Sequence, residues 1–227
     1  MFLRQALTIA AKDLRAEWRT REAVNASLAF MLVILVLFSF AFDPGNSDVD
    51  IHAIAGGLLW LAYSFAAALA LNRSFARELQ NDCLDALLAS PISASALFLG
   101  KALANFALLM TMEIVSLGVF SVFYNVKIGA HFWELLLVIA LGTWAMTVMG
   151  TMFSALTVNL RLRELMLPVM MYPSLIVPLT AAITLTSDLL NGIPWGGQNL
   201  LWVKVLVGFN VIFTALVVIL IDTVLVG

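Results

Sequence analysis

Charged side chains are scarce in this sequence. Lysine and arginine together number 12 and aspartate and glutamate 14, which makes 11% of 227 residues, whereas 63% are hydrophobic. Soluble domains carry about 25% charged and roughly 45–50% apolar residues. The composition, with a mean hydropathy of +1.03, therefore excludes a large soluble domain and predicts an integral membrane protein. The net charge of −2 gives no reason to expect a nucleic-acid partner.

Cysteine and histidine are nearly absent. The single Cys83 excludes an internal disulfide framework and a multi-thiolate metal site. The two histidines, His52 and His131, fall in outer loops or at helix starts, and neither has a second ligand at helical spacing beside it. We therefore expect no metal site, no pair of axial haem ligands and no stably bound cofactor in this chain.

Catalytic and nucleotide-binding motifs are also missing. The sequence contains no Walker A, HExxH or GxSxG motif, and no Ser/Lys or paired-Asp pattern typical of intramembrane proteases. An enzyme is therefore not expected, and any ATP hydrolysis linked to this chain would come from a partner.

Six stretches are apolar and long enough to cross a bilayer as helices, which takes about 20 residues each. They are residues 23–42, 53–72, 102–126, 135–160, 165–187 and 199–221. None shows the alternation of a β-barrel strand. The sequence thus predicts an all-α membrane protein, with one transmembrane permease domain over residues 1–227.

The distribution of basic residues predicts the orientation. Six spans place both termini on one side. If that side is the cytoplasm, the inner segments hold ten of the 12 basic residues, namely Arg4, Lys12, Arg15, Arg19, Arg21, Arg73, Arg77, Lys101, Arg161 and Arg163. This excess satisfies the positive-inside rule. We therefore expect both termini in the cytoplasm.

A polar island separates the second and third spans. Residues 73–101 read RSFARELQNDCLDALLASPISASALFLGK, which predicts a helix over 74–90, a Ser-Pro break and the start of another helix. One edge of the first helix is apolar and consists of Leu84, Leu87 and Leu88. Its rim is polar and consists of Arg77, Glu78, Asp82 and Asp85. An apolar ridge with a charged rim suits docking into a partner's groove. Alternatively, the ridge lies on the bilayer surface or on the chain's own inner face.

The first 22 residues predict a separate element. Its apolar residues recur at helical spacing and are Leu3, Leu7, Ala10, Leu14 and Trp18. Roughly opposite them lie Arg4, Lys12, Arg15 and Arg19. This pattern predicts a basic amphipathic helix in the inner membrane interface. It is either a simple anchor or a helix that packs beside the docking segment.

Glu113 is the only charged residue deep within a predicted span. An intramembrane carboxylate is costly and is usually functional. Two roles stay open. Glu113 either holds the helix over 102–126 to a neighbour through hydrogen bonds, or belongs to a transport pathway.

The fifth span holds prolines at every fifth position, namely Pro168, Pro173 and Pro178. Each removes a backbone donor, so together they predict a helix that is kinked or broken into pieces. The segment is either a curved helix that fills space or a hinge in the moving part of a transporter. A charged inner turn directly before it, formed by Arg161, Arg163 and Glu164, favours the hinge.

Several segments, taken in order, resemble the cytochrome c maturation protein B family, the haem-exporter membrane (permease) subunit of an ATP-binding-cassette (ABC) transporter. They are KDLRAEWRTRE at 12–22, FAFDPG at 40–45, LNRSFARELQNDCLDALLASP at 71–91, GKALANF at 100–106, GTMFSAL at 150–156 and RLRELMLPVMMYP at 161–173. The most telling of these is 71–91, where the family has a charged run, a Leu-acidic pair, then Leu and Pro. The corresponding residues here are Arg77, Glu78, Leu84, Asp85, Leu87 and Pro91. Asp82 departs from the family, in which glycine is more usual.

The resemblance implies an ABC-2-like permease with six spans, an N-terminal interfacial helix and a coupling helix between the second and third spans. It implies that ATP is bound by a soluble subunit (protein A), and that this chain works as a homodimer beside a haem-handling membrane subunit (protein C) and a small membrane subunit (protein D). The location implied is the bacterial inner (plasma) membrane, surrounded by lipid. ATP hydrolysis would drive haem export, with haem as substrate of the complex, or release of a haem-loaded chaperone.

Two other functions stay open from the sequence. A permease of the same architecture could export a drug, a lipid or a glycan, and its copurifying partners would then differ. A scaffold could assemble the maturation complex without transport, and the ATPase would then not respond to it.

Overall fold

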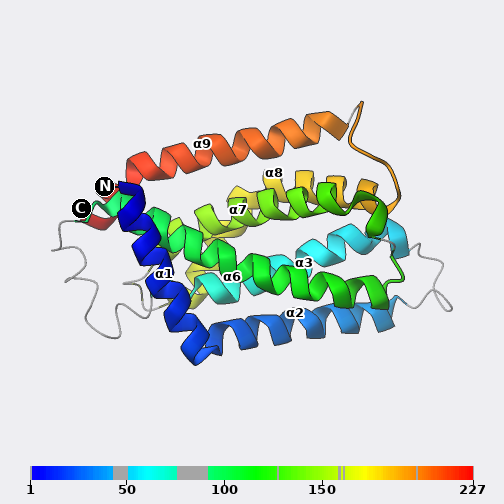
Figure 1. The fold of residues 1–227 in the computed structure, drawn as a ribbon, viewed down its shortest axis with the longest axis horizontal. Coiled ribbons are helices and arrows are strands. Elements are labelled where there is room, and N and C mark those ends of the chain that lie inside the picture. The colour runs from blue at the N-terminus through cyan, green and yellow to red at the C-terminus, as the bar shows by residue number, and fades with distance from the viewer. Residues whose placement is uncertain are drawn as a thin grey trace.

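The computed structural model describes residues 2–42, 51–75, 92–126, 128–157, 160, 162–197 and 199–226. These residues form seven α-helices, one short 3₁₀ helix (η1, Gly129–His131) and no strand (Figure 1). The helices are α1 (Phe2–Thr20), α2 (Glu22–Ala41), α3 (Ile51–Leu71), α6 (Ala94–Phe123), α7 (Phe132–Thr157), α8 (Arg163–Leu190) and α9 (Asn199–Val226). The all-helical fold predicted from the sequence is confirmed.

All of these helices except α1 are long and apolar enough to cross a membrane, which makes six candidate spans in the described part of the chain. They lie side by side in one elongated bundle, and α1 crosses one end of it (Figure 1). The beginning of α1 and the end of α9 lie at that same end. This arrangement agrees with an even number of spans, while the side that faces the cytoplasm stays a prediction.

Helix α6 begins at Ala94, which confirms the helix start predicted after the Ser-Pro break. The predicted membrane span began later, at residue 102, because Lys101 is charged. Ser93 caps it, since its Oγ accepts a hydrogen bond from the Ala96 backbone N–H at 3.2 Å. The Lys101 side chain is only 1% exposed and lies within the protein. Its charge therefore does not mark the start of the helix.

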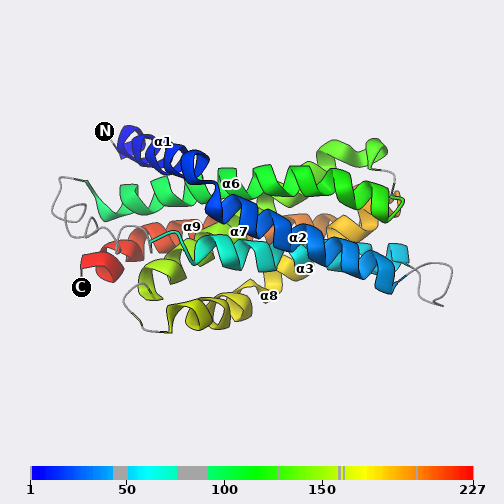
Figure 2. The same cartoon turned by 90° about the horizontal axis from the view of Figure 1, so that it is seen from below.

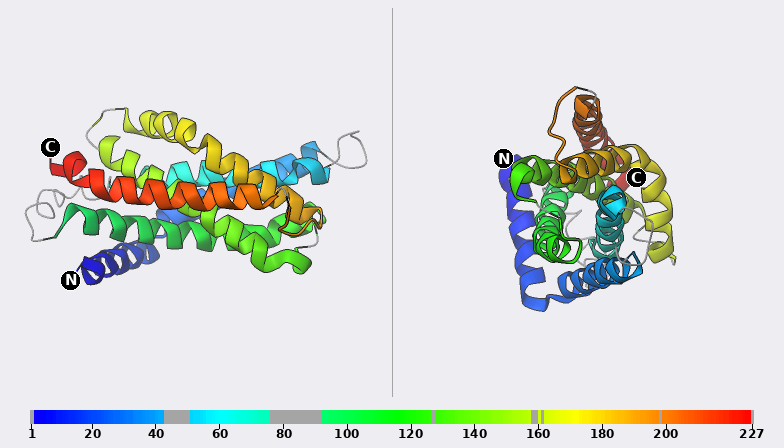
Figure 3. Two further views of the ribbon diagram at one scale, coloured as in Figure 1. Left: turned by 90° about the horizontal axis from the view of Figure 1, so that it is seen from above. Right: turned by 90° about the vertical axis from the view of Figure 1, so that its right-hand side faces the viewer.

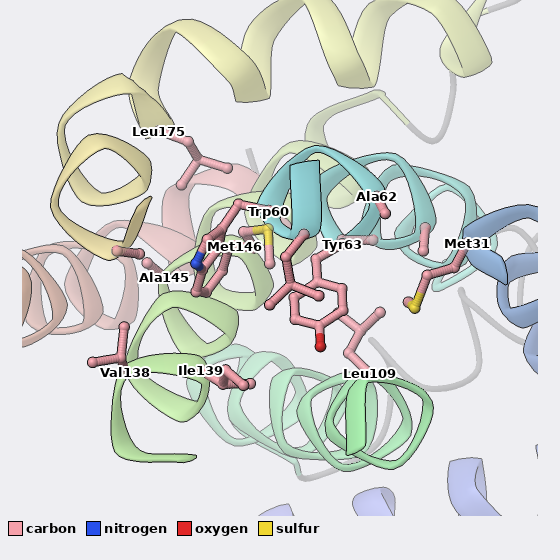
Figure 4. Packing of buried hydrophobic residues seen from close by; sticks show 14 of the residues in the cluster. Met31, Trp60, Ala62, Tyr63, Leu109, Val138, Ile139, Ala145, Met146 and Leu175 are labelled. Atoms are coloured by element: carbon pink, nitrogen blue, oxygen red, sulfur yellow. The ribbon is translucent and has the colours of Figure 1, made fainter. Parts of the chain in front are cut away.

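The core gathers around α3, where Trp60 and Tyr63 are almost completely buried (Figure 4). The Trp60 ring lies against the backbone of Gly142 on α7, so closely that a Cβ added to Gly142 would overlap it. The Trp60 Nε1 donates a hydrogen bond to Thr186 Oγ1 on α8 at 2.9 Å. One tryptophan side chain thus fixes α3 against both α7 and α8.

Helix α8 keeps its helical structure through Pro168, Pro173 and Pro178. It bends along its length (Figure 3). Of the two outcomes that the prolines predicted, the structure therefore has a bent helix rather than separate pieces. Tyr172 joins the bent helix to α3, because its hydroxyl donates to the Ser64 backbone oxygen at 3.2 Å.

The last helix, α9, is attached to α7 by two polar contacts. Trp144 Nε1 donates to Thr214 Oγ1 at 3.0 Å, and Asn210 Nδ2 donates to the Leu141 backbone oxygen at 2.9 Å. In the end-on view α9 lies at the outside of the bundle (Figure 3). Hydrogen bonds at this apolar surface give α9 a defined position that contacts between aliphatic side chains alone would leave variable.

Candidate functional site

Only Ser74 and Phe75 of the predicted docking helix over 74–90 belong to the described residues, and they lie in a turn after α3; residues 76–90 fall outside the described part. This applies to Arg77, Glu78, Leu84, Asp85, Leu87 and Leu88, and also to Arg161 in the charged turn. Arg163 is the first residue of α8, and Glu164 beside it is exposed. The structure does describe the two points at which the docking segment joins the bundle, and the candidate site is built from them.

The chain is held tightly where it leaves α3, at Ser74 and Phe75. Lys101 Nζ donates a hydrogen bond to the Ser74 backbone oxygen at 2.8 Å and lies 4.8 Å from the centre of the Phe75 ring. Asn105 Nδ2 donates to Ser74 Oγ at 2.8 Å and to Thr151 Oγ1 on α7 at 3.0 Å. The end of α3 is thus joined to both α6 and α7.

The chain returns to the described structure at Ile92, and Ser93 then caps α6. Lys101 follows Ser93 by about two helical turns, or roughly 12 Å along the axis. Both ends of the segment 76–91 are therefore attached to the first turns of α6. A force on this segment would act on α3 and α6 together.

Helix α1 packs against the same turns of α6 (Figure 2). Its buried face includes Ala6, Ile9 and Ala10. A Cβ at Gly100 of α6 would lie 2.6 Å from the Ala6 backbone oxygen and 2.7 Å from Ile9 Cβ, so only glycine allows this approach. Asp13 Oδ2 accepts a hydrogen bond from Lys101 Nζ at 3.2 Å. Ala10 belongs to the predicted apolar stripe, whereas the sequence did not indicate that Ala6 and Ile9 would be buried.

That predicted stripe is mostly exposed in the structure. Leu3, Leu7 and Trp18 are 66%, 60% and 63% exposed, whereas Ala10 is buried against the bundle. Helix α1 therefore packs against the bundle with one face and leaves a large apolar surface on another. Its location in the membrane interface stays a prediction, and these exposed side chains are suited to it.

The turn from α1 to α2 is fixed by Glu17. This side chain is buried, and its Oε1 accepts hydrogen bonds from the backbone N–H groups of Ala23 at 2.9 Å and Val24 at 3.1 Å. Between them, Arg21 adopts a left-handed conformation with φ of 52°. A carboxylate at the start of α2 satisfies donors that no helical carbonyl can reach and interacts favourably with the helix dipole.

A cavity of about 240 Å³ lies between α1, α2, α3 and α6, next to these anchors. Its polar lining consists of Lys12, Asp13, Glu17, Arg73, Ser74 and Asn105. Its apolar lining consists of Ala16, Ala23, Val24, Ala70, Ala104, Leu108 and Met112. Ser74 and Asn105, which anchor the docking segment, therefore border this cavity.

Glu113 lies in the middle of the bundle, where α3, α6 and α7 meet. Its Oε2 accepts a hydrogen bond from Thr143 Oγ1 at 2.5 Å. Its backbone oxygen accepts from the Tyr63 hydroxyl at 3.1 Å and from Ser116 Oγ at 2.9 Å. Its Oε1 is buried and has no hydrogen-bond partner among the described residues. The geometry supports a role in joining helices, and a role in a transport pathway stays a prediction.

Within the described ranges no three His, Cys, Asp or Glu side chains are grouped as a metal site would require. His131 Nδ1 lies 3.4 Å from Glu134 Oε2, at the end of α7 opposite the docking anchors. The side chain of His52 lies outside the described residues. The expectation that this chain binds no cofactor stays a prediction.

The chain is similar to known proteins along nearly its whole length. The family model for CcmB protein matches residues 4–224. Heme exporter protein B of Rhodobacter capsulatus is 34% identical over 163 residues, which are 72% of this chain and 73% of that protein. Heme exporter protein B of Paracoccus denitrificans is 30% identical, covering 71% of this chain and 73% of that protein. Heme exporter protein B of Haemophilus influenzae is 26% identical, covering 89% and 90%.

Proposed function

Because this chain belongs to the CcmB protein family, we propose that it is the membrane subunit of a haem exporter that serves cytochrome c maturation. The family match confirms the resemblance that the sequence showed. Family membership also favours a transporter subunit over an enzyme. The relatives named Heme exporter protein B support haem, rather than a drug, a lipid or a glycan, as the substrate of the complex.

Energy for the proposed transport comes from a partner. The chain has no nucleotide-binding motif, so a soluble ATP-binding subunit (protein A) binds and hydrolyses ATP. That subunit docks on the segment 74–90, with Leu84, Leu87 and Leu88 as the apolar ridge. The observation that carries this proposal is the attachment of both ends of that segment, through Ser74 and Ser93, to the first turns of α6.

The proposed movement begins when ATP closes the motor dimer and pushes the docked segment. Because Ser74 is bonded to Lys101 and Asn105, the push tilts α3 and α6 together. Helix α8 follows, since Tyr172 joins it to α3, and its bend at Pro168, Pro173 and Pro178 acts as the hinge. The charged turn of Arg161, Arg163 and Glu164 precedes that hinge.

The complex would contain further subunits. We expect two copies of this chain beside a haem-handling membrane subunit (protein C) and a small membrane subunit (protein D), in a bacterial inner membrane with both termini cytoplasmic. The result of the cycle is haem export or release of a haem-loaded chaperone at the outer face.

The substitution Leu87→Asp tests the docking segment, because a charge in a desolvated contact costs about 2–4 kcal/mol there. We expect the variant to insert and accumulate, to lose copurification with the ATP-binding subunit or to uncouple its ATP hydrolysis, and to stop cytochrome c maturation. The matched control is Ala86→Asp, which helical spacing places on the opposite side of the same helix.

Two results would contradict the docking proposal. Normal copurification and normal maturation with Leu87→Asp would mean that the segment does not couple to the ATPase. Degradation of Leu87→Asp, with Ala86→Asp stable, would mean that the ridge packs against the chain itself.

A further inference from the structure

Lys101 joins α1 to the point where the docking segment leaves α3. We propose that Lys101 is a positioning residue that makes α1 part of the ATP-driven element rather than a passive anchor. This inference rests on the proposed function, because it assumes that the segment after Ser74 is the one pushed by the ATPase.

Burial distinguishes Lys101 from the other basic residues around Asp13. Lys101 Nζ and Lys12 Nζ lie 3.2 Å and 3.0 Å from oxygens of the same Asp13 carboxylate, but their side chains are 1% and 50% exposed. Lysine is almost never fully buried unless its charge is paired. The Asp13 carboxylate is 21% exposed, and a partly buried ion pair is also screened less by salt than an exposed one. The Lys101 pair is therefore the one suited to hold α1 in place.

The partners of Lys101 come from two separate elements. Asp13 belongs to α1, whereas the Ser74 carbonyl and the Phe75 ring follow α3. Phe75 is itself fully buried, so it cannot move without displacing its neighbours. One ammonium group thus connects α1 directly to the chain that enters the docking segment.

Close packing prevents α1 from slipping past this connection. Gly100, the residue before Lys101, lies directly under Ala6 and Ile9. Along the helix from there, Glu17 fixes the turn into α2. Helix α1 is thus held at three points along its length, namely at Ala6 and Ile9, at Asp13 and at Glu17. A shift of the Ser74 carbonyl would therefore carry Asp13 and the whole helix with it.

The exposed face of α1 shows what such a shift would change. Leu3, Leu7 and Trp18 point away from the bundle. A helix with this face in the membrane interface changes its depth or tilt when its attachment moves. ATP binding at the docking segment would therefore change how α1 contacts the inner leaflet.

The assembled complex in lipid nanodiscs tests the inference. Thr8, which is exposed on α1, is changed to Cys in a Cys83→Ser background and carries an environment-sensitive fluorophore. In the complex whose chain carries no further substitution, we expect a non-hydrolysable ATP analogue to shift the emission of this fluorophore. With Lys101→Met that shift should be lost and maturation should fall, while the ATP-binding subunit still copurifies and hydrolyses ATP. Lys12→Met, which removes the exposed cation from the same carboxylate, should keep the shift.

If Lys101→Met does not accumulate, a second variant tests the same link between α1 and α6. Asp13→Asn keeps Lys101 bonded to Ser74 but weakens the link to α1, so the shift should shrink at least several-fold. An unchanged shift in Lys101→Met or in Asp13→Asn would overturn the inference and leave the docking proposal standing. No shift in the parent complex, although the ATPase is bound, would overturn it as well. Failure of the parent chain to bind the ATPase would instead refute the proposed function.

Discussion

Thr143 on α7 donates a hydrogen bond of 2.5 Å to the carboxyl group of Glu113 on α6, and both residues are completely buried. The two helices are therefore joined by a polar contact in the middle of an apolar bundle. Polar links between membrane helices contribute about 1 kcal/mol on average. A larger cost is expected when one partner is removed, because the other is left buried without a bond.

This pair gives a prediction that separates the two roles of Glu113. Thr143→Val keeps the shape of the side chain but removes the donor, and should lower stability by about 1–3 kcal/mol. Glu113→Gln keeps an oxygen that can accept from Thr143, and should change stability by less. Thermal unfolding in detergent measures both. If Glu113→Gln is stable and supports maturation, the residue is structural; if it is stable and maturation stops, Glu113 belongs to the transport pathway.

Gly142 gives a prediction about packing. Its substitution by Ala places a methyl group against the Trp60 ring, and such overpacking costs about 1–3 kcal/mol. The control is Gly57→Ala on α3, since a Cβ there meets no atom within 4 Å. We expect a lower melting temperature for Gly142→Ala and an unchanged one for Gly57→Ala. Equal effects of the two substitutions would show that Trp60 does not pack as described.

The bend of α8 gives a prediction about movement. Replacing Pro168, Pro173 and Pro178 together by Ala restores three backbone donors and should straighten the helix without loss of stability. If the bend is a hinge, the variant should accumulate normally and yet reduce cytochrome c maturation several-fold. Pro194→Ala, in the loop after α8, is the control and should leave maturation unchanged. Normal maturation with the triple variant would favour the curved helix that only fills space.

Orientation can be tested with the single native thiol. If the docking segment faces the cytoplasm, a membrane-impermeant maleimide should label Cys83 in inside-out vesicles and not in cells whose outer barriers are removed. Ser47→Cys, in the first outer loop, should show the reverse in a Cys83→Ser background. Labelling of Cys83 from outside would invert the predicted topology.

Histidine ligation of haem is expected to be absent. Purified alone, the chain should show no stoichiometric Soret band. His52→Ala and His131→Ala should each leave maturation largely intact, because no second ligand stands at helical spacing beside either histidine and no group of three His, Cys, Asp or Glu side chains occurs among the described residues. Loss of maturation in either variant, with the subunit folded and assembled, would show that the histidine takes part.

The sequence predicted the spans well because apolar length alone determines which segments can cross a membrane. It began the third span only at residue 102, eight residues into α6, because it treated Lys101 as a residue in water. Its true environment depends on Asp13, which is 88 residues away in the chain. Glu113 was located correctly from its depth within a span, but its partner Thr143 could not be identified. Thr143 is one of several hydroxyl residues in apolar segments, and only the packing of α6 on α7 selects it.

The two faces of α1 show the same limit. The spacing of Leu3, Leu7 and Trp18 correctly indicated an amphipathic helix, but Ala10 was placed in the same stripe and Ala6 in neither face, and both are buried against the bundle. Their contact depends on Gly100, which offers a surface without a side chain. Such contacts between small residues are common where membrane helices approach closely, and composition alone does not reveal them.

The Trp60 indole that lies over Gly142 also limits which movements are available to the transporter. A ring seated at one glycine lets α3 and α7 pivot about that point, but it blocks them from sliding past each other along their axes. One helix therefore cannot slide along the other, with or without rotation about its own axis. Helix α3 should therefore tilt against α7 about this contact near the middle of the bundle, so that a small displacement at the docking end is matched by an opposite displacement at the far end.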